Sequence, residues 1–412
     1  MNKQERAALS VMGALFLVQI LAAGPGLAMA GVMMTPLIRA FHWSHEEVSE
    51  LFLISTITGG LVAPGVGWLM DRIGGRWVMG AGVALMVAGY GMSSRADSFG
   101  AMELAFAVFG AGLMLGGTLP VMVVCVNWFE TKRATAGGVL WIGLAAGLTI
   151  TPPSVTWVVA HYGWRMGFRG LAGPALLLVL PATLLLVRTR PPMASAKSVA
   201  QEVATLPGLE LKPALLTLVF WLLLAGDLLY SVGFGSVFVH QITYLIGLGY
   251  SPQQAAWVFS AQTLVSGVGA IAFGSLADRF GARRMLSTAL VVIAVGIVAF
   301  TGAGNRQWGV AAIGVFVLFW GLGAGCIPPV LPVLLAQTTG LRRMGTLSGV
   351  IRFVAAFSTA LGPVLAGHMF DVTGSYVPAF LLAAGLLVVA AGSIALVHPA
   401  PGADRVPQQA AA

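Results

Sequence analysis

Charged side chains are scarce in this chain of 412 residues, at only 9% of the total, whereas soluble proteins carry roughly 25%. Hydrophobic residues make up 58%. A surface with so few charges cannot face water everywhere, so we expect much of it to face a lipid bilayer. The net charge of +8 does not indicate a nucleic-acid partner, because the Lys and Arg residues lie at the ends of apolar segments rather than in one patch.

Cysteine and catalytic motifs are equally sparse. The two cysteines, Cys125 and Cys326, lie in apolar stretches, with no disulfide framework and no metal-ligand spacing. The sequence has no HExxH, no Walker loop and no GxSxG, and no catalytic grouping at helical spacing inside an apolar stretch. We therefore expect no cofactor, no metal and no enzymatic activity. A sensor is disfavoured because no sizeable polar domain is present.

Long apolar segments fill the chain instead. Each has about 20 residues or more, enough for a helix to cross roughly 30 Å of hydrocarbon. They cover residues 9–38, 47–70, 77–94, 99–128, 135–160, 166–187, 214–246, 253–277, 285–303, 307–338, 344–370 and 376–397. The sequence thus predicts an all-α membrane protein with twelve transmembrane helices.

The distribution of Lys and Arg predicts the orientation of these helices. With the N-terminus inside, sixteen of these residues fall on the cytoplasmic side and five on the other, and Arg352 lies within a span. Cytoplasmic loops carry the excess of positive charge in membrane proteins. We expect both termini to be cytoplasmic, in a bacterial inner membrane.

The two halves of the chain are copies of each other. The stretch from Gly67 to Arg76, GWLMDRIGGR, matches GSLADRFGAR from Gly274 to Arg283 at an offset of 207 residues. Further pairs follow at an offset of 211, including Gly163 with Gly374. The repeat predicts two pseudo-symmetric six-helix bundles, at 1–187 and 213–398, with a cytoplasmic linker at 188–212 and a disordered tail at 399–412.

The repeated loop suggests a conformational role. Asp71 and Asp278 end their helices beside arginines, where a carboxylate can cap a neighbouring helix and pair with guanidinium groups. We expect these loops to gate the cytoplasmic side; the residues are Asp71, Arg72, Arg76, Asp278, Arg279 and Arg283. Capping boxes at Ser44–Glu47 and Ser251–Gln254 predict where the following helices begin.

The twice-repeated GxLxDRxGxR loop between two six-helix halves resembles the major facilitator superfamily over the whole chain. Phe41-His-Trp43-Ser44 and Asn127-Trp-Phe-Glu-Thr-Lys-Arg133 resemble its branch of monocarboxylate transporters and oxalate/formate antiporters. The resemblance implies transport of small organic anions by proton coupling or exchange, in a carrier that works by alternating access.

Ionisable residues deep inside spans are costly and indicate function. Asp227 and Arg352 are the two that lie well inside. We expect Arg352 to bind a substrate carboxylate, with Asp227 as its counter-ion or as the carrier of the coupled proton. The candidate substrate-binding residues are Arg352, Asp227, Tyr230, Gln19, Gln262 and Trp141, and those for proton coupling are Asp227 and His240.

Purely structural roles are alternatives for several of these residues. Arg352 and Asp227 can form a purely structural ion pair, and Gln19 and Gln262 can serve only to join helices. His240 can be a histidine in a wet cavity or at the membrane interface rather than a proton carrier. The leading hypothesis is a monomeric, proton-driven carrier of a small organic anion. The alternative is efflux of a neutral or amphipathic molecule, which is favoured by the absence of arginine from the apolar segment 253–277 and by the many Met and Phe residues.

Overall fold

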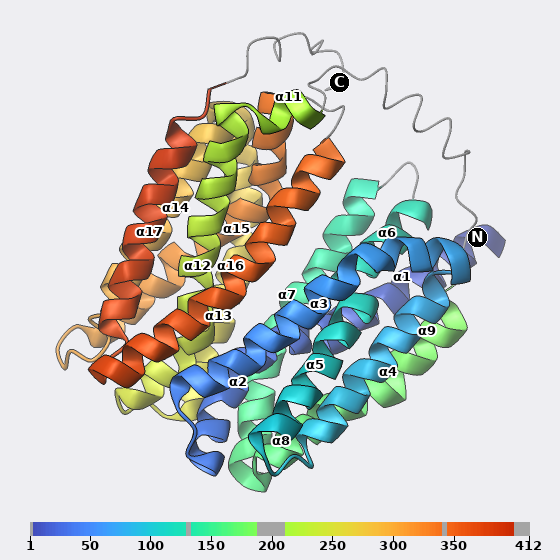
Figure 1. Cartoon of the computed structure of the whole chain (residues 1–412), viewed down its shortest axis with the longest axis horizontal. Helices are drawn as coiled ribbons and strands as arrows, with labels where there is room; N and C mark the ends of the chain where they lie inside the picture. Colours follow the sequence, from blue (N-terminus) through green and yellow to red (C-terminus); the bar gives the residue numbers. More distant parts are fainter. Residues whose placement is uncertain (1–2, 129–132, 188–210, 340–343, 399–412) are drawn as a thin grey trace. The chain divides into compact units, whose positions relative to one another are not determined.

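A computed structural model of the chain describes residues 3–128, 133–187, 211–339 and 344–398, and these residues are almost entirely helical (Figure 1). Each of the twelve predicted segments is helical. Within these described ranges, ten helical stretches are long and apolar enough to cross a membrane. The predicted segments 47–70 and 77–94 are the remaining helices, α3 and α4. The all-helical membrane fold is confirmed, and the count of twelve spans stays a prediction.

The chain divides into two compact units. The first comprises Met1–Met193, Phe238–Leu264 and Pro363–Gly374, and the second comprises Ala194–Val237, Val265–Gly362 and Ser375–Ala412. Segments of three helices from the second half of the sequence thus pack with its first half. The predicted linker and tail lie outside the described residues, apart from α11 (Leu211–Leu215) at the end of the linker.

The first unit is built from the N-terminal helices. These are α1 (Lys3–Val18), η1 (Gln19–Ala23), α2 (Gly24–Phe41), α3 (His45–Ile73), α4 (Gly75–Ser93), α5 (Phe99–Gly116), α6 (Thr118–Trp128), α7 (Arg133–Tyr162), α8 (Trp164–Pro174), η2 (Ala175–Val179) and α9 (Leu180–Leu186). Edge-to-face aromatic contacts join α3, α5 and α8: Phe52 packs on Phe106 at 5.2 Å between ring centroids, and Phe106 on Phe168 at 6.3 Å.

The second unit contains the other ends of the three shared helices, α12 (Leu218–Gly247), α13 (Pro252–Phe280) and α16 (Met344–Thr373). It also holds α14 (Ala282–Phe300), α15 (Gly309–Thr339) and α17 (Val377–Ala395), which lie side by side (Figure 1). Phe300 of α14 stacks on Phe316 of α15 at 4.0 Å and on Phe380 of α17 at 5.9 Å, so an aromatic core holds these helices.

The internal repeat is visible in the backbone. Gly74 after α3 has φ 84°, and Gly281 after α13 has φ 89°, a region that side chains rarely adopt. Both glycines therefore permit the same tight turn into the next helix. The predicted capping boxes are confirmed: Ser44 and Glu47 bond each other's backbone N–H groups, as do Ser251 and Gln254.

Candidate functional site

Gln19 begins a π-helical turn that interrupts the first long helix. Such turns are frequently found at functional sites, and sequence periodicity does not reveal them. The Gln19 side chain is fully buried, and its Oε1 accepts a hydrogen bond from Thr118 Oγ1 at 3.1 Å. Its Nε2 has no partner within the described part of the chain. This amide group therefore retains unused donors in a buried place.

Close packing of α7 positions Gln19. A Cβ atom added to Gly147 would lie 2.6 Å from the carbonyl oxygen of Ile20, and one added to Gly143 would lie 3.3 Å from Gln19 Cβ. These contacts leave no room for a side chain at Gly147. The glycines of α7 thus allow the π-helical turn to lie directly against the helix.

A second buried amide lies on α13, beside another face of α7. Ser260 Oγ donates to the carbonyl oxygen of Thr149 at 2.6 Å, which fixes α13 against α7 within the first unit. Two residues further on, Gln262 is 1% exposed, and neither of its amide atoms has a partner among the described residues. A buried polar group left unsatisfied costs about 1–3 kcal/mol. We therefore expect a water molecule or a ligand to form the missing hydrogen bonds of Gln19 and Gln262.

Asp227 and Tyr230 belong to the second unit, on the same face of α12. Asp227 is 7% exposed and borders a cavity of about 10 Å³, which is lined by aliphatic side chains of α14, α15 and α17. Such a volume holds roughly one water molecule. The cavity beside Asp227 therefore has space for a water molecule but not for an organic substrate.

Trp141 and Arg352 are the remaining predicted binding residues. Trp141 on α7 is 49% exposed, so its ring is available for contact with a ligand or lipid. Arg352 lies in α16, and its side chain falls outside the described residues. The pairing of Arg352 with Asp227 stays a prediction.

Three arginines of the predicted gating loops contact aromatic rings or a backbone carbonyl oxygen. The Arg72 guanidinium lies 4.8 Å from the centre of the Trp68 ring, and that of Arg76 lies 5.4 Å from Trp77. In the second copy, Arg283 donates to the carbonyl oxygen of Val397 at 2.9 Å, and Arg279 is exposed. The side chains of Asp71 and Asp278 lie outside the described residues, so their gating role stays a prediction.

A cluster of two histidines and two carboxylates, which sequence reasoning missed, joins α3 to α16 in the first unit. Asp371 accepts hydrogen bonds from the backbone N–H groups of His45 at 3.2 Å and Glu46 at 2.9 Å, and from His45 Nδ1 at 3.1 Å. His368 Nδ1 donates to Glu46 Oε2 at 2.8 Å. Burial lowers the pKa of the His45 imidazole, and the hydrogen bond to Asp371 opposes that shift. We call these four residues the α3–α16 latch.

His240 lies close to this latch. It is fully buried, its Nε2 donates to the carbonyl oxygen of Pro363 at 2.9 Å, and it lies 3.4 Å from Ser49 Oγ. His240 is therefore packed in the protein rather than wet at an interface. The sequence held only part of the signal for the latch: His45, His240 and His368 all fall at the same predicted end of their helices, but this does not indicate that those helices meet.

Comparison with known proteins decides the family. A family model described as Major Facilitator Superfamily matches residues 15–251 and 242–411. The chain belongs to the major facilitator superfamily. It is therefore a multi-pass membrane transport protein rather than an enzyme, and the resemblance on which the sequence analysis relied is confirmed.

Similar members of the superfamily include eukaryotic monocarboxylate transporters. Monocarboxylate transporter 13 of Bos taurus is 25% identical over 88% of this chain and 83% of its own length. Monocarboxylate transporter 12 of Homo sapiens is 25% identical over 82% of this chain and 69% of its own length. The solved structure of a bacterial homologue of the human lysosomal transporter Spinster, inward-facing and unoccupied, covers 96% of this chain and 98% of that protein, with a TM-score of 0.76 at 16% identity. That likeness supports the fold.

Proposed function

We propose that this chain is a secondary active transporter of a small organic anion of the carboxylate type, coupled to protons and working by alternating access. The observation that carries the proposal is the pair of buried amides, Gln19 and Gln262, whose side-chain nitrogen atoms have no partner among the described residues. An amide N–H donor suits a carboxylate acceptor. The monocarboxylate transporters among the relatives support the same class of substrate.

Within this proposal, the residues divide into charged and neutral groups. Arg352 binds the carboxylate in two-point contact, because its planar guanidinium matches that geometry. Gln19 and Gln262 donate hydrogen bonds to the substrate, and Trp141 contacts its apolar body. Asp227 balances Arg352 when the carrier is empty, or takes up the coupled proton through the water-sized cavity beside it.

A second candidate function is efflux of a neutral or amphipathic metabolite. The relatives also include the Aspyridones efflux protein of Emericella nidulans, 26% identical over 83% of this chain and 66% of its own length. The buried amides of Gln19 and Gln262 carry no charge, and they suit a neutral polar substrate equally well.

Counterflow in proteoliposomes separates the two functions. Vesicles preloaded with a carboxylate should accumulate a labelled copy of that carboxylate, and an inward proton gradient should increase the accumulation. The deciding comparison is between the accumulation of several monocarboxylates and the accumulation of their neutral amides. Accumulation of the amides but not of the acids would favour the efflux function and refute the anion proposal.

A further inference from the structure

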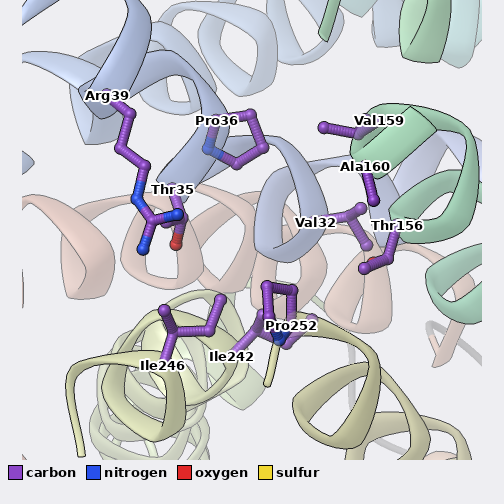
Figure 2. Close-up of a pocket in the computed structure, with 10 residues that line it drawn as sticks. All are labelled: Val32, Thr35, Pro36, Arg39, Thr156, Val159, Ala160, Ile242, Ile246 and Pro252. Atoms are coloured by element: carbon purple, nitrogen blue, oxygen red, sulfur yellow. The ribbon is translucent and has the colours of Figure 1, made fainter. Parts of the chain in front are cut away.

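A cavity of about 290 Å³ lies in the first unit, at the end of α2 that the charge bias places outside. The lining residues that come from one helix are spaced so that they lie on one face of that helix. Val32, Thr35, Pro36 and Arg39 form one face of α2. Thr156, Val159 and Ala160 come from α7, Ile242 and Ile246 from α12, and Pro252 from the start of α13 (Figure 2). None of these residues belongs to the predicted substrate site.

The cavity combines apolar walls with one cation. Arg39 is the basic residue in the lining, no lining residue is acidic, and within the described ranges Arg39 makes no hydrogen bond or ion pair. Figure 2 shows its guanidinium group at one side of the cavity, with Val159 and Ala160 at the other. The N-terminus of α13, a 29-residue helix, adds the positive end of a helix dipole at Pro252. Both features favour an anion.

The walls are held in place by polar contacts of neighbouring residues. The hydroxyls of Thr35 and Thr243 are hydrogen-bonded at 3.0 Å, which joins α2 to α12. Gln253 Nε2 donates to the carbonyl oxygen of Pro153 at 3.4 Å, which joins α13 to α7. The cavity is therefore a formed feature of the first unit. Its volume is near the lower end of the roughly 300–1,000 Å³ of ligand sites.

We propose that this cavity, the Arg39 pocket, binds a small organic monocarboxylate, with Arg39 contacting the carboxylate and the aliphatic walls contacting a short apolar body. The inference rests on the proposed function for the class of anion, and it adds a second site, separate from Arg352, at the predicted outer end of the carrier. An anion held there would be concentrated beside the helices that must separate to admit it.

Protection of an introduced cysteine tests the pocket directly. Ala160 is exposed and lines the cavity, so Ala160→Cys places a thiol there with little change in size. The two native cysteines are buried and are replaced by alanine. Butyrate should slow alkylation of Cys at position 160 in the purified protein, whereas butyramide, its neutral analogue, should not. Thr156→Cys provides a second reporter if the first variant fails to fold.

Arg39→Gln should weaken the protection by butyrate about tenfold or more, because it removes a charge-assisted two-point contact. Arg169→Gln is the matched control: Arg169 is exposed, falls on the same predicted side and does not line the pocket, so protection should persist. Equal protection in Arg39→Gln, equal protection by butyramide, or none by butyrate would overturn the proposal.

Uptake of labelled butyrate, measured in parallel, separates the two proposals. If uptake proceeds while butyrate gives no protection, the pocket is wrong and the transport function stands. If butyrate protects but no carboxylate is taken up, the pocket binds anions and the proposed transport function fails.

Discussion

Aromatic rings pack between helices in both units, but the units differ in the polar side chains that join their helices. In the first, polar side chains from distant parts of the sequence meet: His45 with Asp371, Glu46 with His368, and Thr35 with Thr243. In the second, the hydroxyls of Ser236 and Ser287 bond backbone carbonyl oxygens, and rings such as Phe234 pack on Trp320 at 5.1 Å. Asp227 borders a small cavity that is lined mainly by aliphatic side chains. Protons and small polar ligands should therefore alter the first unit more readily, whereas the second should respond mainly to loss of a buried charge.

The largest effect is expected from Arg352, in the second unit. Arg352→Gln should abolish measurable binding of the anion, and Arg352→Lys, which keeps the charge but loses the planar fork, should weaken it about tenfold. Isothermal titration of the purified carrier with the transported carboxylate measures both. A purely structural ion pair with Asp227 predicts instead that both variants fold poorly, because a buried charge is left alone. Wild-type transport by a folded Arg352→Gln protein would place the site elsewhere.

A smaller loss, in stability, is expected from a single methyl group in the first unit. Gly147→Ala places a Cβ atom 2.6 Å from a backbone carbonyl oxygen and should destabilise the protein by about 1–3 kcal/mol, because backbone must move. Gly314 on α15 is the control, since a Cβ atom there meets nothing within 4 Å. Thermal unfolding in detergent should show a lower Tm for Gly147→Ala only. Equal Tm values would show that α7 tolerates separation from η1.

The sequence predicted what depends on local pattern. The helical segments, both capping boxes and the repeated glycine turn follow from periodicity and from residue types a few positions apart. The π-helical turn at Gln19 and the latch do not, because they depend on which helices pack together. His45 and Asp371 are 326 residues apart, and nothing in the period of either helix indicates that they meet. The same reason explains why Asp227 could be assigned a depth from the sequence but not its aliphatic surroundings.

The repeated loops allow the two halves to be compared at equivalent positions. Asp71→Asn and Asp278→Asn should each slow transport severalfold while leaving equilibrium binding of the anion unchanged, because both residues lie at helix ends, far from the depth where such carriers hold substrates. Initial uptake rates and binding, measured on the same preparation, give the two readouts. A folded variant that no longer binds the anion would contradict a gating role. A slow rate in only one variant would show that the copies have diverged.

The smallest effect is expected from protonation of the latch. The pKa of His45 is lowered in the packed arrangement, mainly by burial, so the imidazolium form is disfavoured there. Acidification from pH 7.5 to 5.5 passes through the ordinary histidine range of about 6.5 and should weaken the contact between α3 and α16. The other ionisable groups that face His45 are Asp371, Glu46, His368 and the buried His240.

Spin labels at Leu61 on α3 and Val372 on α16, both exposed, would report this change as a longer and broader distance distribution at pH 5.5. His45→Gln removes the titrating group and should abolish the response. His161→Gln, an exposed histidine bonded only to the carbonyl oxygen of Trp157 among the described contacts, should keep it. If the distance distribution of His45→Gln still changes fully with pH, His45 is not the group responsible, and the same substitution at His368 and at His240 is the next test. If the distance distribution of the parent protein does not change with pH, protonation does not weaken the contact between α3 and α16. The expectation that protons alter the first unit more readily than the second would then be wrong.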